Sequence, residues 1–189
     1  MVERVKVSMR ARLVDAATEL FYAEGLRAVS VDKVIAQAGT TKVTFYRHFK
    51  SKDDLVVAHL ELRAQLERDG IGAALAHSGG SPDRAFRLIA EQLGSMACLP
   101  GFRGCPFINA AAEYPDPDSP VRRTVAGHRA WCKAAFADLV GPLGLADPSA
   151  VADDLMLVRD GAMVAGYLDD AGALAASFLR SCQALTQPR

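Results

Sequence analysis

The stretch of the chain richest in groups suited to recognition chemistry is residues 39–52, GTTKVTFYRHFKSK. It combines five basic or imidazole side chains with three aromatic rings. Lysine and arginine side chains pair with phosphate oxygens, and hydroxyl groups donate hydrogen bonds to the same oxygens. These residue types predict a surface that meets a negatively charged partner, provided that the neighbouring elements hold them outward.

Hydroxyl residues mark the starts of three helices around this stretch. Ser30, Thr41 and Ser51 each stand directly before a helix-forming run, where a side-chain oxygen accepts a hydrogen bond from the first turn. Helix N-termini present unpaired N–H groups and a partial positive charge, which favour phosphate. Between the first two helices, Gly39-Thr40 is a short glycine-containing connection typical of a DNA-binding helix-turn-helix. An ordinary helical hairpin is the alternative at this point.

The helix predicted over residues 42–48 has an inward and an outward face. Phe45 and Phe49 stand at positions i and i+4 and share the inward face. A helix of two turns is not stable in isolation, so packing must hold it, and its polar side chains are left for a partner. On the outward side, Lys42 suits a guanine edge and Thr44 suits a thymine methyl group.

Charge is distributed unevenly, although the chain of 189 residues has a formal net charge of zero. Residues 1–60 hold ten Lys/Arg and seven Asp/Glu, a balance of +3, and the remaining residues hold twelve and fifteen, a balance of −3. This asymmetry is expected of a nucleic-acid-binding end attached to an acidic partner domain.

Localisation is predicted from hydropathy and cysteine usage. The N-terminal residues are charged throughout, and the longest uncharged run, Gly70–Pro82, is glycine-rich. It is shorter than the about 20 apolar residues of a membrane span. The four cysteines show neither CxxC nor CxxH spacing, which favours free thiols in a reducing compartment. We therefore predict a soluble cytoplasmic protein with no membrane partner.

Hydrophobic periodicity predicts an all-α fold of about nine helices. Near residues 9–24, apolar side chains recur at the i, i+3, i+4, i+7 spacing of a half-buried helix. Besides the short helices, helical patterns occupy about 52–68 (which IGAAL can prolong), 82–97, 104–113, 120–140, 149–168 and 171–186. No segment sustains an alternation of period two, so no strands are predicted. We place a helix-turn-helix DNA-binding domain at 1–52 and a larger helical domain at 53–189.

Residues 38–55, AGTTKVTFYRHFKSKDDL, resemble the signature of the TetR/AcrR-type bacterial transcriptional regulators. The segments 16–25 and 30–39 resemble the earlier helices of that family, so the resemblance spans about residues 10–60. It implies a repressor that binds a palindromic double-stranded DNA operator as a homodimer, with the third helix in the major groove. It also implies that the larger domain binds a small-molecule effector and forms the dimer. Val43 departs from the glycine that the family often has, which affects the expected base preference.

By this resemblance, the residues that contact DNA form two groups. Lys42, Thr44 and Arg47 face bases or the nearby backbone, with Gln37 on the preceding helix. Residues at the helix starts and along the third helix hold phosphates. The complete predicted DNA-binding set is Ser30, Gln37, Thr40, Thr41, Lys42, Thr44, Tyr46, Arg47, His48 and Lys52. Two-fold symmetry implies half-sites about 34–36 Å apart, or a multiple of that spacing.

The C-terminal part offers a few polar and aromatic residues within a large apolar core, which is typical of ligand pockets. Residues 104–116 resemble a segment of one subset of the same family. The candidate effector-contacting residues are Phe107, Asn109, Glu113, His128, Trp131, Cys132, Arg159, Met163 and Tyr167. Core packing is the simpler explanation for His128, Cys132 and Met163. The histidines are well separated in sequence, so we predict no metal site, and no cofactor is expected.

Two other function classes stay open at this point. Cys98 and Cys105 flank a turn at a spacing that permits a disulfide, so a thiol-based redox-sensing regulator is the alternative, although few cations lie near them in sequence to activate a thiolate. The sequence shows no Ser/His/Asp or Cys/His arrangement, no phosphate-binding glycine loop and no clustered carboxylate pair. We therefore predict that the protein is not an enzyme.

Overall fold

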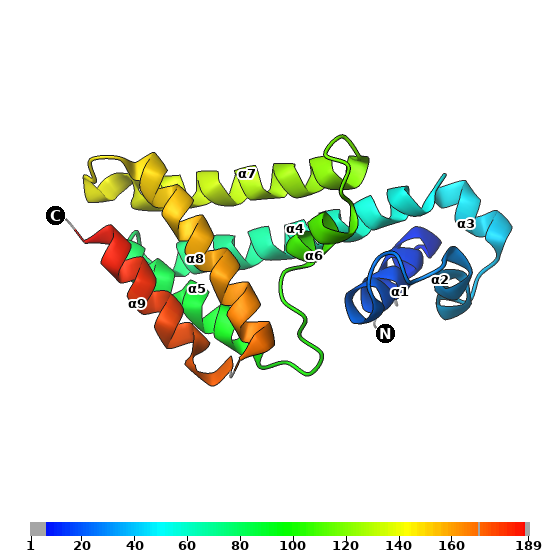
Figure 1. The fold of residues 1–189 in the computed structure, drawn as a ribbon, viewed down its shortest axis with the longest axis horizontal. Coiled ribbons are helices and arrows are strands. Elements are labelled where there is room, and N and C mark those ends of the chain that lie inside the picture. Colours follow the sequence, from blue (N-terminus) through cyan, green and yellow to red (C-terminus); the bar gives the residue numbers. More distant parts are fainter. Residues whose placement is uncertain (1–6, 170, 188–189) are drawn as a thin grey trace, which may run out of the picture. The chain divides into compact units, whose positions relative to one another are not determined.

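The computed structural model describes residues 7–169 and 171–187, and within them it contains nine α-helices and no strand (Figure 1). The helices are α1 (Met9–Glu24), α2 (Val31–Ala38), α3 (Lys42–His48), α4 (Lys52–His77), α5 (Pro82–Ala97), α6 (Pro106–Glu113), α7 (Pro120–Val140), α8 (Pro148–Leu168) and α9 (Leu174–Thr186). Two 3₁₀ turns, η1 (Gly141–Leu143) and η2 (Ala171–Ala173), precede α8 and α9. The prediction of an all-α fold is confirmed. Within the described ranges, no helix combines the length and apolar character that a bilayer-spanning segment requires.

The hydroxyl residues noted above start their helices. Ser30 Oγ and Thr41 Oγ1 each accept a hydrogen bond from the backbone N–H three residues on, at 3.1 and 3.2 Å. Ser51 Oγ accepts from the N–H of Asp54 at 3.1 Å, while the N–H of Ser51 donates to Asp54 Oδ2 at 3.0 Å. This reciprocal arrangement is a capping box with Asp in place of Glu. Such caps typically stabilise a helix by about 1 kcal/mol.

Helix α4 continues well past Arg68, through Gly70 and Gly72 to His77. A glycine in a helix interior costs about 1 kcal/mol relative to alanine. The extension is nevertheless helical because its apolar residues pack into a core: Ala74 is buried.

The chain forms two compact units. The first contains the residues up to Arg63 together with Pro106–Val125, and the second contains Ala64–Cys105 and the chain from Ala126 onward. Compactness thus groups α6 and the first turn of α7 with the N-terminal helices. The functional boundary between residues 52 and 53 stays a prediction.

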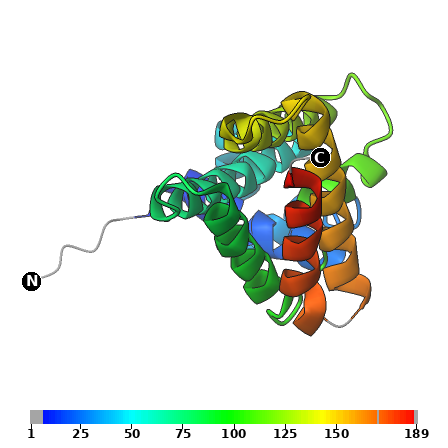
Figure 2. The same ribbon diagram turned by 90° about the vertical axis from the view of Figure 1, so that its left-hand side faces the viewer.

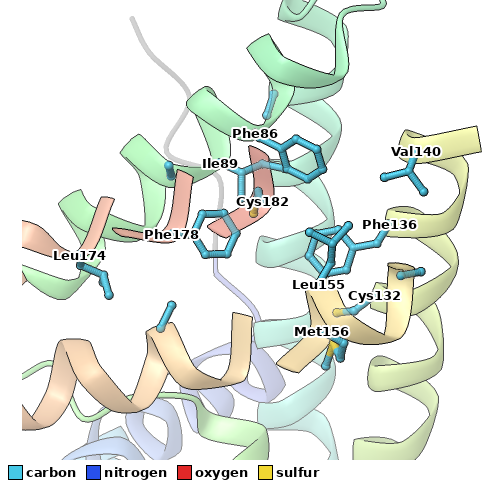
Figure 3. Packing of buried hydrophobic residues seen from close by; sticks show 14 of the residues in the cluster. Phe86, Ile89, Cys132, Phe136, Val140, Leu155, Met156, Leu174, Phe178 and Cys182 are labelled. Atoms are coloured by element: carbon cyan, nitrogen blue, oxygen red, sulfur yellow. The ribbon is translucent and has the colours of Figure 1, made fainter. Parts of the chain in front are cut away.

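The second unit has one hydrophobic core built from α5, α7, α8 and α9, with Ala74 of α4 (Figure 3). Figure 2 shows α5, α8 and α9 running side by side. The side chains labelled in Figure 3 come from all four of these helices: Phe86, Ile89, Cys132, Phe136, Val140, Leu155, Met156, Leu174, Phe178 and Cys182. Burying a large apolar side chain contributes about 1.5–3 kcal/mol.

Candidate nucleic-acid interface

Helix α3 is held against the first unit by two phenylalanines. Phe45 and Phe49 are buried, and their ring centroids lie 5.8 Å apart. The guanidinium of Arg10, at the start of α1, lies 5.2 Å from the centre of the Phe49 ring. These contacts supply the packing that a seven-residue helix needs to persist in water.

The opposite side of α3 is open to solvent. We call the exposed side chains there the α3 face: Lys42, Val43, Tyr46, Arg47 and His48. The Tyr46 ring contacts Phe45 edge-on, with centroids 5.1 Å apart, so a buried anchor restrains a side chain that is 48% exposed. Lys42 pairs with Asp32 at 3.4 Å, but both side chains are exposed and such a pair contributes little. The α3 face therefore carries donors and positive charge that are free to meet a partner.

The connection between α2 and α3 depends on Gly39. Its backbone is left-handed, with φ 62° and ψ 49°, a conformation that glycine adopts without strain. A Cβ atom at this position would also lie 3.3 Å from Nη2 of Arg12. That same Nη2 donates a hydrogen bond of 2.6 Å to the carbonyl of Ala38, so α1 closes the end of α2. The turn angle that presents α3 is thus defined by contacts on both sides.

Four of the predicted DNA-binding residues are less available than the α3 face. Gln37 is exposed but its amide donates to Glu19 Oε2 at 2.8 Å. Lys52 is half-buried and its ammonium donates to the carbonyl of Arg27 at 3.2 Å. Burial lowers the pKa of Lys52. Thr40, in the turn, and Thr44, in α3, are half-buried too.

Val43 is a surface residue that sequence reasoning treated only as a departure from a pattern. It is 75% exposed, on a helix whose other apolar residues are anchored in the core. An exposed isopropyl group can pack against a thymine methyl group. Val43 is the second residue of α3 and does not share the side of the helix that carries Phe45 and Phe49. That position in the sequence is the signal that predicts its exposure.

Glu113, at the end of α6, packs onto the α1–α2 connection within the first unit. Its carboxylate accepts hydrogen bonds from the backbone N–H groups of Leu26 at 2.9 Å and Arg27 at 2.7 Å. Gly25, with φ 97°, makes room for it, because a Cβ there would lie 3.3 Å from Glu113 Oε1. The next residue, Tyr114, donates its hydroxyl proton to Asp53 in the first turn of α4 at 2.9 Å. Sequence reasoning placed Glu113 in an effector pocket and missed this contact, which joins segments far apart in the chain.

In the second unit, the structure brings together three of the predicted effector-contacting residues and adds Glu67, which sequence reasoning did not single out. We call Glu67, His128, Cys132 and Arg159 the Glu67 cluster. Arg159 donates to Glu67 Oε1 from Nε at 3.1 Å and from Nη2 at 2.7 Å. His128 Nε2 lies 3.1 Å from Glu67 Oε2 and 3.4 Å from Cys132 Sγ. The side chain of Glu67 is 26% exposed, whereas those of Arg159 and His128 are buried.

The other predicted effector residues are spread over both units. Trp131 stacks on His128 with ring centroids 6.2 Å apart, Met163 is buried, and Tyr167 is exposed. Phe107 and Asn109 lie on α6 in the first unit, where Phe107 is buried and Asn109 is exposed.

The electrostatics of the Glu67 cluster follow from pairing in a buried place. Burial alone would raise the pKa of Glu67, but the hydrogen bond from His128 and the charge of Arg159 outweigh it and lower that pKa to about 2. For Arg159, burial acts to lower the pKa and the Glu67 carboxylate more than reverses it. Burial, and secondarily the Glu67 carboxylate, raises the pKa of Cys132 to about 12. The ion pair is therefore charged, and the thiol protonated, at neutral pH.

This arrangement does not form a nucleophilic triad. Glu67 and Cys132 both approach the same ring nitrogen of His128, Nε2. In a catalytic triad the carboxylate orients the base through its other nitrogen. A protonated thiol is also a poor nucleophile.

One solved structure decides the family of the chain. SCO4454, a TetR-family transcriptional regulator from Streptomyces coelicolor, is 40% identical over 94% of this chain and 94% of its own, with a TM-score of 0.87. This chain belongs to the TetR family of transcriptional regulators. The model of bacterial regulatory proteins, tetR family, matches residues 13–59, the helix-turn-helix region. The resemblance to TetR/AcrR-type regulators predicted from the sequence is confirmed, and with it DNA binding through a helix-turn-helix.

Other likenesses are more limited. The HTH-type transcriptional activator FasR of Mycolicibacterium smegmatis is 35% identical over 66 residues, which is 35% of this chain and 30% of FasR. The matched segment thus spans less than a third of that relative's length. The reduced form of E. coli NemR is 17% identical with a TM-score of 0.81, covering 94% of this chain and 97% of NemR. That likeness shows the fold.

Proposed function

We propose that this TetR-family regulator is a repressor that binds a palindromic operator as a homodimer and leaves it when a small-molecule effector binds. The α3 face carries the proposal, because it presents basic, phenolic and apolar side chains on a helix anchored by two buried rings. The relative FasR is named an activator, so the direction of regulation belongs to the proposal.

Roles on the α3 face follow from side-chain chemistry. Lys42 and Arg47 suit guanine edges in the major groove, and Val43 suits a thymine methyl group, as does Thr44, a half-buried residue of α3 outside the α3 face. Tyr46 suits phosphate oxygens, which position a protein without reading sequence.

An apolar stripe on α8 supports the homodimer. Leu157, Val164 and Leu168 are 68%, 45% and 69% exposed and stand at spacings of seven and four, which place them on one side of the helix. Exposed apolar residues gathered in this way mark protein interaction surfaces. We expect the same stripe of a second subunit to cover them in an isologous contact.

Effector release requires only moderate coupling between two sites. An effector that favours the DNA-incompetent state by about 1–3 kcal/mol weakens operator binding roughly 5–150-fold, and DNA weakens effector binding by the same factor. The second unit, with His128, Trp131 and Met163, supplies the residues that we expect to meet the effector.

The test is selection of bound sequences from random duplex DNA with the purified protein, repeated with a panel of small apolar and amphipathic compounds. We expect a two-fold symmetric site whose recovery falls with at least one compound. Tyr46→Ala should weaken binding to all sequences, and Lys42→Ala should relax preference at one position of each half-site. Recovery of no palindrome would overturn the operator proposal, and equal losses on every sequence would overturn the division of roles.

The dimer is tested separately by sedimentation. Leu157→Glu places a charge in the apolar stripe and should yield monomers at concentrations where the wild type is dimeric. Leu99→Glu is the matched control, since Leu99 is 61% exposed on a turn outside α8. A dimeric Leu157→Glu variant would move the interface elsewhere.

One observation supports the thiol-based alternative. Nη1 of Arg159 donates a hydrogen bond to Cys105 Sγ at 3.4 Å, which puts a cation beside one of the two sulfurs. Oxidation of Cys98 and Cys105 by hydrogen peroxide would join the two sulfurs, with the two thiol protons and two electrons converting the peroxide to two waters. If this chemistry controls the regulator, peroxide releases DNA from the wild type and not from Cys105→Ser. Equal release from both proteins removes the alternative.

A further inference from the structure

Three potential metal-ligand atoms converge on one point in the second unit. His128 Nε2, Cys132 Sγ and a carboxylate oxygen of Glu67 all lie within 4.8 Å of one another. His128 and Cys132 stand one helical turn apart on α7, and Glu67 comes from α4. Sequence reasoning predicted no metal site because the four histidines are well separated in the chain.

Two of the three separations are close to the edges of a tetrahedral site. Bonds of about 2.0–2.1 Å to nitrogen, 2.3 Å to sulfur and 2.0–2.2 Å to oxygen imply ligand-to-ligand edges of about 3.4–3.6 Å. The observed Nε2 to Sγ distance is 3.4 Å and the Nε2 to Oε2 distance is 3.1 Å, whereas Sγ lies 4.0 Å from Glu67 Oε1. An ion between the three atoms therefore requires the Glu67 carboxylate and the Cys132 sulfur to move closer together.

Arg159 makes the donor set selective. Its guanidinium neutralises the Glu67 carboxylate and contacts both of its oxygens, with Nη2 2.7 Å from Oε1 and 2.9 Å from Oε2, while Oε2 also lies 3.1 Å from His128 Nε2. With that charge already balanced, the site offers little to a hard cation that is held by carboxylates alone. Imidazole nitrogen and thiolate sulfur instead favour zinc and similar borderline or soft ions.

We propose that Glu67, His128 and Cys132 bind a zinc-class divalent ion in a three-ligand site, with Arg159 as the partner that orients the carboxylate. A site with three protein ligands keeps one position for water or another small ligand. The proposal concerns the ligand of the Glu67 cluster and does not depend on operator binding. It goes beyond the proposed function, since binding is measured on the protein without DNA.

Binding must displace the thiol proton, because the thiolate is the form that binds metal. Metal binding at Cys132 therefore competes with a proton, and the affinity is expected to rise as the pH is raised from 6 to 8.

The site lies in a packed and largely apolar setting. Figure 3 shows Cys132 beside Met156 and Leu155 of α8. Of the three ligand residues, only Glu67 has a partly exposed side chain, whereas His128 and Cys132 are buried. We therefore expect an ion to enter the site past Glu67. The apolar residues around the site limit the access of water and lower the local dielectric constant once the ion is bound.

The experiment titrates the full-length, reduced, metal-stripped protein with cobalt(II) chloride. We expect one cobalt per chain, a sulfur-to-cobalt charge-transfer absorption, and its loss when zinc chloride is added. Cys132→Ala should remove the absorption and weaken binding at least about 100-fold, whereas His128→Gln should weaken binding by a similar factor. Cys182→Ala is the matched control, because Cys182 is also a buried cysteine of the second unit. An absorption that survives in Cys132→Ala, or fails to form in the wild type, overturns the proposal.

A second measurement needs no variant and covers the case in which Cys132→Ala does not fold. Wild-type protein is treated with a maleimide with and without zinc chloride, and the labelled cysteines are located by mass spectrometry. Zinc should slow labelling of Cys132 at least tenfold while the exposed Cys98 reacts at an unchanged rate. Equal protection of both thiols, or of neither, contradicts the site.

Discussion

The α3 face and the Glu67 cluster use similar side chains in opposite ways. On α3, charged and aromatic groups stand in water and make few contacts with one another. In the Glu67 cluster, an arginine, a histidine and a carboxylate are withdrawn from water and satisfy each other. Exposed charges contribute little to folding and stay available to a partner. Buried charges must be paired, because an unpaired one costs several kcal/mol. The two regions should therefore respond to substitution in opposite ways: the first in binding, the second in stability.

The largest loss of stability is expected from Glu67→Ala. It removes the main carboxylate partner of the buried Arg159 guanidinium and leaves Asp160, 3.2 Å from Nη1, so we expect the free energy of unfolding to fall by about 3 kcal/mol. Chemical denaturation of the variant and the wild type measures this. Glu91→Ala, which removes an exposed carboxylate on α5, is the control and should change stability by less than about 0.5 kcal/mol.

A double variant sharpens that result. Adding Arg159→Met to Glu67→Ala removes the buried guanidinium that has lost its main partner and should recover much of the lost stability, since apolar replacements of buried ion pairs are often neutral. A double variant that is less stable than Glu67→Ala alone would contradict the assignment of the loss to an orphaned charge.

The next effect is a pH dependence that comes from His59 in the first unit. This residue is buried, packs edge-on against Phe21 and contacts Thr18 Oγ1 at 3.0 Å. Burial and the charge of Arg63 lower its pKa from 6.5 to about 4. Between those values the unfolded chain binds a proton that the folded chain does not. Stability contributed by the neutral ring is therefore complete above pH 6.5 and falls by about 3 kcal/mol as the pH approaches 4.

Denaturation at several pH values measures this slope. His59→Gln should flatten it between pH 6.5 and 4.5, whereas His77→Gln, at the exposed end of α4, should leave it unchanged. A slope that persists in His59→Gln would assign the proton uptake to another group. His59 would then respond to substitution like the exposed side chains of the α3 face and not like the buried Glu67 cluster.

A smaller effect is expected from Glu113→Gln. The amide keeps one oxygen but presents N–H groups where the carboxylate accepts from Leu26 and Arg27, so we expect a loss of about 1–2 kcal/mol. Thermal unfolding measures the change, and Glu61→Gln on the exposed side of α4 is the control. Unchanged stability would show that water replaces this contact at no cost.

The smallest change in stability is expected on the α3 face. Arg47→Ala should alter the free energy of unfolding by less than about 0.5 kcal/mol, because an exposed surface position makes few contacts. If Arg47 meets a phosphate, the slope of log affinity against log salt should fall by about 1. Filter binding at several salt concentrations measures it. A loss of stability larger than that of Glu113→Gln would break the comparison between the two regions.

Local signals in the sequence were sufficient for the helices and for the surface of α3. The caps at Thr41 and Ser51 and the Phe45–Phe49 pair depend on residues within one or two helical turns, so spacing reveals them. The Glu67–Arg159 pair joins residues 92 positions apart, and no local pattern reveals such a contact. The contact of Glu113 with the α1–α2 connection also joins distant parts of the chain, so no local pattern predicts it. The chemistry of Glu113 alone suggests a residue of a ligand pocket.

The Glu113 contact also has a consequence for synthesis on the ribosome. Leu26 and Arg27 lie in the residues up to Arg63, but their acceptor is made fifty residues later (113 − 63). At about 5–20 residues per second, the N-terminal helices wait about 3–10 s for it. During that interval the backbone N–H groups of Leu26 and Arg27 donate hydrogen bonds only to water. A fragment intended to carry the DNA-reading helices should therefore fold more tightly if it extends through Val125 than if it ends at Arg63.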